Sequence, residues 1–378
     1  MSLHRILALA LCLLLPTFAS ANVAPVPPNL AANAWLLIEV SSGQTLAAEK
    51  ADQRLEPASL TKLMTAYLSF AALRDNKLKL TQTLPVSEKA WRTGGSKMFV
   101  KVDTQVAVDD LLKGMIVQSG NDACVVLAEG IAGSEENFAQ MMNREAKRLG
   151  MKHTHFRNST GLPDPQHVTT ARDLATLATA LIRDFPTEYQ KYYSLKEFRY
   201  ANISQPNRNR LLWTDPTVDG VKTGHTDAAG YCLISSALRE QRRLLAVVLG
   251  TSSDKARATE SAKLLNWGYI AYDAVNLYPQ GRPVGTPRVW KGSKNQVAAG
   301  FDQAFTIAVP KGMGDQLKAE YIAPARLMAP VKKGQIVGSL KLTLAGQPYG
   351  EYPVSSQADV PLAGAFGRAV DTVKLWFK

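Results

Sequence analysis

The stretch Glu56-Pro57-Ala58-Ser59-Leu60-Thr61-Lys62-Leu63-Met64 decides how this chain is organised. It opens an apolar run, 63–73, that predicts a buried helix. Ser59 and Lys62 are three residues apart, and positions i and i+3 share one face of a helix. The pattern predicts a hydroxyl within reach of an amine, as a serine nucleophile activated by a lysine base requires. A plain helix N-cap is the alternative for Ser59 taken alone.

Two later tripeptides support the assignment of Ser59 and Lys62 as nucleophile and base. Ser-x-x-Lys alone is expected about once or more by chance in such a chain, and Ser252-Ser253-Asp254-Lys255 also fits it, in a polar loop after a predicted strand. Ser119-Gly120-Asn121 begins 60 residues after Ser59, and Lys222-Thr223-Gly224 begins 103 residues later. Each tripeptide has about one chance in ten of occurring at random. Their presence together, in this order, favours Ser59 over Ser252 as the nucleophile.

The N-terminus predicts export. His4 and Arg5 precede a ten-residue apolar stretch, 6–15, and Ala19-Ser20-Ala21 is a small-residue cleavage site. We therefore expect residues 1–21 to be a signal peptide and the mature chain to start near Asn22. No later run reaches the roughly 18 apolar residues typical of a transmembrane helix.

The distribution of charged, histidine and cysteine residues argues against nucleic-acid binding and against metal binding. The net charge is +12, but the basic residues are scattered and not interleaved with aromatics, so we expect no nucleic-acid partner. Attraction to an anionic surface, such as lipid headgroups or wall polymer, and a merely solvated basic surface both fit. His153 and His155 are the one close histidine pair, without a metal motif, so we expect neither a metal nor another cofactor. Cys124 and Cys232 are expected to be buried free thiols, with a single disulfide as the alternative.

The periodicity predicts an α+β protein. A hairpin, 34–50, is followed by helices and then by antiparallel strands that a helix, 258–272, closes. This pattern indicates a domain over 22–275 with an antiparallel sheet flanked by helices. Short strand-like runs separated by Gly, Pro and Asn then indicate a small all-β domain over 276–356.

The last segment, 357–378, predicts an amphipathic helix. At helical spacing one face carries apolar residues and the other carries mostly charged residues. The apolar face consists of Leu362, Phe366, Ala369, Val370, Val373, Trp376 and Phe377. Such a helix suits an anionic membrane surface, contacted through Leu362–Lys378. The alternative is a helix docked on the body of the protein.

The three motifs match those of the serine penicillin-recognising enzymes. Within that group the chain resembles the bacterial low-molecular-mass D-alanyl-D-alanine carboxypeptidases of the penicillin-binding protein 5 type. The resemblance spans nearly the whole chain, including Ser119–Cys124, Gln205–Arg210 and Asp219–Thr226. It implies a cofactor-free enzyme on the periplasmic side of the bacterial inner membrane. It also implies peptidoglycan stem peptides ending in D-Ala-D-Ala as substrates and covalent binding of β-lactam antibiotics.

The same resemblance implies a role for each site residue. Ser59 would form the acyl-enzyme, Lys62 would accept its proton, and Ser119 would pass a proton to the departing amine. Asn121 would hold the substrate backbone, and the N–H groups of Ser59 and His225 would form the oxyanion hole. The terminal carboxylate would face Lys222 and Thr223, with Arg257 and Arg208 as further candidates. The substrate-binding set is Asn121, Lys222, Thr223, Gly224, His225 and Arg257.

Three alternatives remain open at this point. A serine β-lactamase shares the three motifs, but no Glu-x-x-Leu-Asn segment, which class A enzymes use to direct water, lies between Ser119 and Lys222. Glu135, Glu136 and Glu145 fall in predicted helices. A D,D-endopeptidase acting on wall cross-links and a non-catalytic wall-binding protein are the other two.

Overall fold

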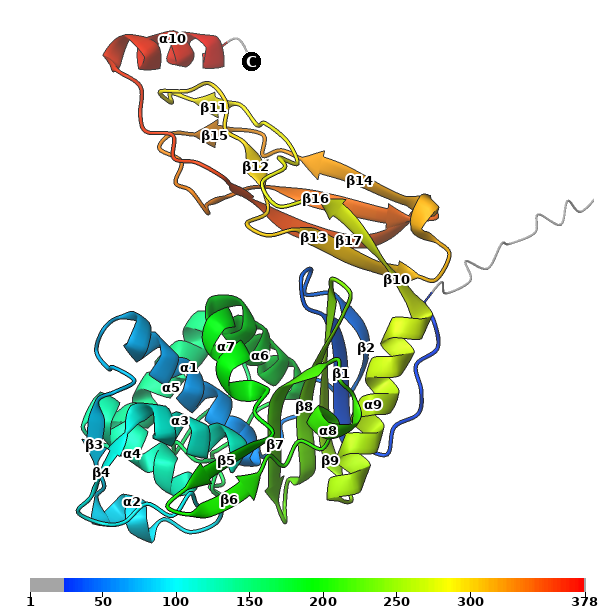
Figure 1. Cartoon of the computed structure of the whole chain (residues 1–378). Helices are drawn as coiled ribbons and strands as arrows, with labels where there is room; N and C mark the ends of the chain where they lie inside the picture. Colours follow the sequence, from blue (N-terminus) through cyan, green and yellow to red (C-terminus); the bar gives the residue numbers. More distant parts are fainter. Residues whose placement is uncertain (1–23, 377–378) are drawn as a thin grey trace, which may run out of the picture.

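A computed structural model describes residues 24–376, which form two domains connected by a long helix (Figure 1). The expected signal peptide, 1–21, lies outside the described residues, as do Phe377 and Lys378 of the predicted terminal helix. The α+β class is confirmed, because the first domain combines helices with an antiparallel sheet and the second is built of strands.

A five-stranded antiparallel sheet forms the centre of the first domain, in the order β2-β1-β9-β8-β7. Its strands are β1 (Ala34–Glu39), β2 (Thr45–Glu49), β7 (Val218–Thr226), β8 (Gly230–Arg239) and β9 (Arg242–Thr251). Successive residues of a strand point to opposite faces, and both faces of this sheet are buried. In β1, Leu36 and Ile38 belong to one core cluster, whereas Trp35 and Leu37 belong to the other.

Helices cover both faces of the sheet, which explains why its strands are apolar on both sides. The larger layer consists of α1 (Lys62–Arg74), α2 (Glu88–Arg92), α3 (Val108–Val117), α4 (Asn121–Ala132), α5 (Glu135–Leu149), α6 (Ala171–Asp184) and α7 (Pro186–Tyr193). On the opposite face α9 (Asp254–Ala271) contributes Leu264 and Leu265 to the second core cluster. The predicted helix 63–73 corresponds to α1, and the predicted helix 258–272 corresponds to α9, which begins four residues earlier. The predicted terminal helix, 357–378, begins only at Ala365. Thr170 caps α6, accepting a hydrogen bond from the Asp173 N–H at 3.1 Å.

Several short elements were not expected from the sequence. The polar segment 76–110 contains β3 (Thr83–Pro85) and β4 (Gln105–Ala107), which pair on either side of α2. Between α7 and β7 lie the hairpin β5 (Glu197–Tyr200) and β6 (Ile203–Pro206) and the single turn α8 (Leu211–Thr214). Such short elements carry too few residues to show a clear period.

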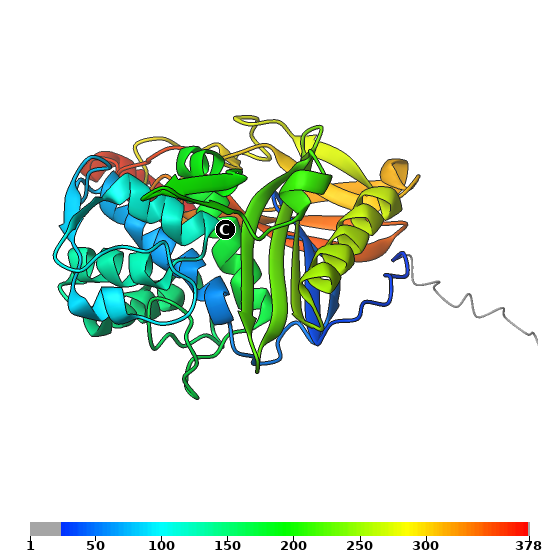
Figure 2. The ribbon, with the colours of Figure 1, turned by 60° about the horizontal axis from the view of Figure 1, so that its bottom comes forward.

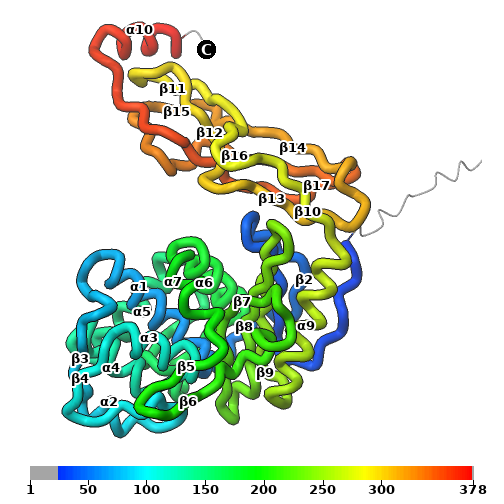
Figure 3. Tube along the Cα trace, in the orientation of Figure 1, coloured from blue at the N-terminus to red at the C-terminus, as the bar shows by residue number. Residues whose placement is uncertain are grey.

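The second domain has its own core, built from apolar residues of its strands. Its strands are β10 (Tyr272–Tyr278), β11 (Val289–Trp290), β12 (Ala299–Gly300), β13 (Phe305–Pro310), β14 (Leu317–Ile322), β15 (Leu327–Met328), β16 (Ile336–Leu344) and β17 (Gln347–Ser356), with a 3₁₀ turn, η2 (Gly314–Gln316). The expected boundary near residue 275 lies inside β10, which pairs with β13 of this domain. Figure 3 shows the single passage of the chain from α9 into β10.

The two domains touch at the tip of the β1–β2 hairpin. The Ser41 hydroxyl donates to the Thr306 carbonyl at 3.1 Å, and the Gln44 amide accepts from the Ala308 N–H at 3.0 Å. Gln44 also donates to the Tyr349 hydroxyl at 3.1 Å. These contacts hold the second domain over the end of the sheet at which this hairpin turns (Figure 1).

The terminal helix α10 (Ala365–Trp376) packs through a polar residue. Asp371 is buried and accepts a hydrogen bond from the Lys291 N–H at 2.7 Å. The apolar face is exposed instead: Phe366 is 84% exposed, Val373 50% and Trp376 79%. The helix caps the end of the second domain away from α9 (Figure 1). No helix within residues 24–376 is both long and apolar enough to cross a membrane.

Candidate active site

Ser59 lies in a 3₁₀ turn, η1 (Ala58–Thr61), which leads directly into α1. The Lys62 Nζ atom donates to the Ser59 Oγ atom at 3.0 Å, so the i, i+3 pairing predicted from the sequence is present. Among the described residues, η1 has no side-chain cap, and its N-cap position is Pro57. The hydroxyl of Ser59 is therefore directed to the lysine rather than used as a cap.

The amine of Lys62 is fully enclosed, since the residue is 1% exposed. Besides Ser59 Oγ, its Nζ atom donates to the Asn121 Oδ1 atom at 2.7 Å and to the Thr160 carbonyl oxygen at 2.6 Å. Burial lowers the pKa of Lys62 to about 8, and the positive charge of Arg208 acts in the same direction. A sizeable neutral fraction of the amine near pH 7 follows, as a general base requires.

The second motif holds Asn121 at the first turn of α4. The Asn121 Nδ2 atom donates to the Gly94 carbonyl and its backbone N–H donates to the Ser96 carbonyl, both at 2.7 Å. Ser119 adopts a φ of 65° just before the helix, and it is 2% exposed. Within residues 24–376 the Ser119 hydroxyl has no hydrogen-bond partner. It is free to take part in a proton transfer.

The third motif lies on β7, the edge strand beside η1 (Figure 2). A Cβ atom on Gly224 would stand 3.2 Å from the Pro57 carbonyl oxygen and 3.1 Å from the Leu60 Cγ atom. A side chain here would force its neighbours to shift by a few tenths of an ångström, so glycine favours the close approach of this strand to the nucleophile turn. Lys222 is 3% exposed and donates to the Thr223 carbonyl at 3.1 Å.

The charge of Lys62 also acts on the second motif lysine. Burial, followed by the positive charges of Lys62, Arg208 and Arg257, holds the pKa of Lys222 well below its usual value.

These segments surround a cavity of about 180 Å³. Its lining residues are Ser59, Gly95, Ser96, Ser119, Asn121, Thr160, Gly161, Leu162, Arg208, Thr223, Gly224, His225, Thr226 and Arg257. Lys62 and Lys222 lie behind this surface. The Arg257 guanidinium donates to the Gly224 carbonyl at 3.2 Å and pairs with Asp254, and the His225 ring stacks on Tyr231 at 3.9 Å.

The structure separates Ser59 from the competing motif. Ser252 and Lys255 are both exposed at the start of α9, where the neighbouring Ser253 acts as the N-cap. The cysteines within the described residues, Cys124 and Cys232, are buried and free.

Several lining residues were not predicted from the sequence, and Thr160 is the one of these that contacts Lys62. Its backbone carbonyl accepts the bond from Lys62, which lies 98 residues away in sequence. Because every residue has a backbone carbonyl, the residue type gives no sign of this contact.

A hydroxyl bonded to a buried, partly neutral amine, beside a second buried lysine and a free serine hydroxyl, is suited to acyl transfer through a serine nucleophile. Comparison with known proteins agrees. Residues 21–253 match the D-alanyl-D-alanine carboxypeptidase family, and residues 272–362 match the C-terminal domain of penicillin-binding protein 5. The chain is 44% identical to the D-alanyl-D-alanine carboxypeptidase DacC of Escherichia coli, over 97% of this chain and 94% of the relative.

Other relatives are similar over their whole length. The D-alanyl-D-alanine carboxypeptidase DacA of Haemophilus influenzae is 42% identical, over 93% of this chain and 91% of that protein. The crystal structure of penicillin-binding protein 5 from the same organism superposes with a TM-score of 0.80 at 41% identity, covering 89% of this chain and 99% of that one. The chain therefore belongs to the D-alanyl-D-alanine carboxypeptidase family.

Proposed function

We propose that this protein is a serine D-alanyl-D-alanine carboxypeptidase of cell-wall peptidoglycan. The observation that carries the proposal is the contact between Lys62 Nζ and Ser59 Oγ at 3.0 Å, set behind the cavity that the three motifs surround. Family membership supplies the substrate class, stem peptides that end in D-Ala-D-Ala, and implies covalent binding of penicillins.

In the proposed reaction, Ser59 Oγ attacks the carbonyl carbon of the penultimate D-alanine while its proton moves to Lys62. The N–H groups of Ser59 and His225 would stabilise the oxyanion, and the terminal carboxylate would lie toward Thr223 and Arg257, which line the cavity. A proton returned through Ser119 reaches the departing nitrogen, the C–N bond breaks and D-alanine leaves. Water then hydrolyses the ester and restores Ser59.

The direct test is a peptide ending in D-Ala-D-Ala. We expect one equivalent of free D-alanine per peptide. A peptide whose terminal carboxylate is amidated should not be cleaved, because the amide lacks the negative charge that the cationic side chains of the site would bind. Release of a dipeptide, or equal cleavage of the amide, would contradict the carboxypeptidase assignment. Cleavage of cross-linked wall fragments, measured alongside, would identify endopeptidase activity.

Penicillin turnover separates the proposal from the β-lactamase alternative. Glu135, Glu136 and Glu145 all lie on α5 and none lines the cavity, so no carboxylate there is placed to direct water at the acyl-enzyme. We therefore expect rapid covalent labelling followed by slow release, observed as a burst of one equivalent in a spectrophotometric assay. Sustained rapid hydrolysis would identify a β-lactamase instead.

We also propose that α10 binds the surface of the inner membrane from its periplasmic side. Its support is the orientation of the helix, because the polar Asp371 is buried against the second domain while Phe366, Val373 and Trp376 are exposed. An exposed apolar face on a helix with basic residues suits the interface of an anionic bilayer. The second domain would then hold the catalytic domain away from the lipid.

Serine replacements at Phe366, Val373 and Trp376 are expected to release the protein from vesicles that contain phosphatidylglycerol. Much of the apolar area available for insertion would be lost, while D-alanine release from a soluble peptide should remain unchanged. Co-sedimentation measures the first and a peptide assay the second. The matched control is Thr372→Ser, on the same helix. Undiminished sedimentation of the triple variant would refute the membrane proposal.

A further inference from the structure

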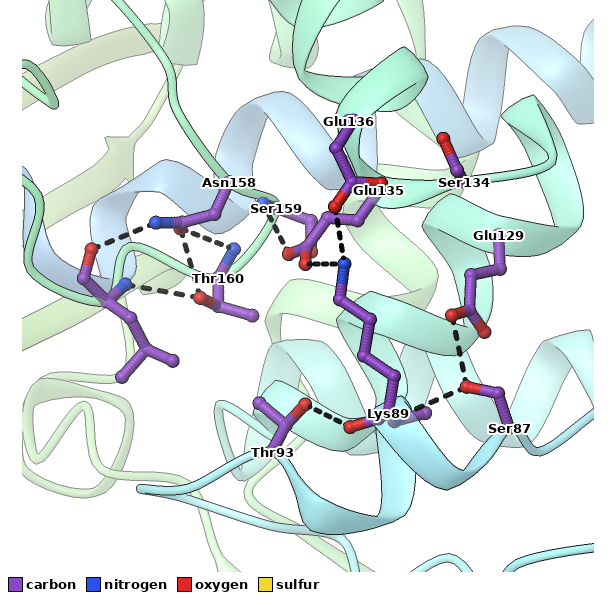
Figure 4. Close-up of polar contacts among 12 residues, drawn as sticks. Ser87, Lys89, Thr93, Glu129, Ser134, Glu135, Glu136, Asn158, Ser159 and Thr160 are labelled. Atoms are coloured by element: carbon purple, nitrogen blue, oxygen red, sulfur yellow. Dashed lines mark hydrogen bonds and ion pairs between the residues drawn. The ribbon is translucent and has the colours of Figure 1, made fainter.

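A chain of polar contacts connects the surface of the helical layer, through Glu135 and Ser159 (Figure 4), to Thr160 and so to Lys62. It begins with Lys89 on α2, whose Nζ atom lies 3.1 Å from the Glu135 Oε2 atom and 2.8 Å from the Glu136 Oε1 atom. The other oxygen of Glu135 accepts from the Ser159 N–H at 3.0 Å and from the Ser159 hydroxyl at 2.7 Å. Glu135 is thus bound on both sides.

The segment that Glu135 holds is the one that contacts the catalytic lysine. The Ser159 carbonyl accepts from the Thr65 hydroxyl at 2.7 Å, and the Thr160 carbonyl accepts from Lys62 Nζ at 2.6 Å. Both Thr65 and Lys62 belong to α1. Residues 159–160 are therefore bound between α1 on one side and Glu135 on the other.

The contact with Thr160 matters because of what a lysine must do as a base. The charged amine has three N–H groups, and here each has an acceptor: Ser59 Oγ, Asn121 Oδ1 and the Thr160 carbonyl. The neutral amine has two N–H groups and one lone pair. With Asn121 and Thr160 accepting the two N–H groups, the lone pair is left facing Ser59. The Thr160 carbonyl thus helps to orient the lone pair of Lys62 toward the Ser59 hydroxyl.

We propose that Glu135, held by Lys89, is a positioning residue for catalysis that acts through Ser159 and the Thr160 carbonyl on Lys62. Two features favour this over a plain surface ion pair. The Glu135 side chain is only 12% exposed, whereas that of Glu136 is 73% exposed. The short helix α2 that carries Lys89 is also anchored, because Ser87 caps it and donates to Glu129 of α4 at 3.0 Å (Figure 4).

The inference rests on the proposed function, and its test uses the rate of acylation by a fluorescent penicillin. Glu135→Ala is expected to slow acylation by about 10- to 100-fold, since a misplacement of about 1 Å can cost 10²-fold. Glu135→Gln is expected to acylate at a rate between those of the wild type and the Ala variant, because its amide oxygen can still accept both bonds from Ser159 while its NH2 group no longer pairs with Lys89. The final labelling stoichiometry should remain near one in both variants.

The matched control is Glu136→Ala, which removes the other partner of Lys89 but, within residues 24–376, takes away no hydrogen bond or ion pair with residues 158–162. It should acylate like the wild type. Equal rates for Glu135→Ala and the wild type would overturn the inference, and so would a Gln variant as slow as the Ala variant. If Glu135→Ala lowered the labelling stoichiometry and the melting temperature but left the acylation rate unchanged, Glu135 would have a purely structural role. A wild type that takes up no penicillin would refute the proposed function itself.

Discussion

An enzyme in which alanine replaces Ser59 is expected to take up no labelled penicillin and to release D-alanine about 10⁶-fold more slowly than the wild type. The reason is that no other described hydroxyl is bonded to Lys62, so removal of the Oγ atom removes the group that forms the ester. Mass spectrometry of the intact protein after incubation with penicillin measures the first effect. A D-alanine assay measures the second.

The chain provides its own control for this experiment. Ser252→Ala changes the serine of the second Ser-x-x-Lys pattern, which is exposed and does not line the cavity. That variant should label and turn over as the wild type does. Labelling that persists in Ser59→Ala and disappears in Ser252→Ala would reverse the assignment of the nucleophile.

The second large effect concerns the base. Since burial lowers the pKa of Lys62 to about 8, the amine is charged below that pH and neutral above it. The acylation rate of the wild type should therefore rise about tenfold per pH unit below 8 and level off above 8, as the basic form becomes dominant. At pH 7 about one molecule in ten carries the neutral amine. Stopped-flow acylation between pH 5.5 and 9.5 records this profile.

Lys62→Ala is expected to lower the acylation rate by about 10²- to 10⁴-fold and to abolish the rise toward pH 8. Lys255→Ala, the matched change in the exposed pattern, should leave both rate and profile intact. If the Lys62 variant kept the same pH dependence, the titrating base would be another group. Lys222, whose pKa burial also lowers, would then be the first to test by the same substitution.

Part of the site could be predicted because its chemistry lies in side chains. Ser59, Lys62, Ser119, Asn121 and Lys222 were selected by residue type, order and context, and the structure gathers them around one cavity or directly behind it. The i, i+3 spacing, together with the apolar run that predicts a helix from residue 63, placed Ser59 and Lys62 in contact, because a helical turn is fixed by neighbouring residues.

Other parts could not be predicted. The φ of 65° at Ser119, the carbonyl of Thr160 and the support of that carbonyl by Glu135 depend on backbone positions and on packing between α1 and α5. The small elements between residues 76 and 110 were missed because runs of three to five residues are too short to show a period.

The sequence by itself determined the class of fold, the order of the three motifs and the amphipathic pattern of the last helix, because all three are properties of local residue patterns. Tertiary structure alone decided which of two Ser-x-x-Lys pairs is buried, since burial depends on what packs against a turn. It also decided which face of α10 is covered, through the contact of Asp371 with Lys291. Burial in turn sets the pKa of Lys62, and this makes the first turn of α1 a catalytic element.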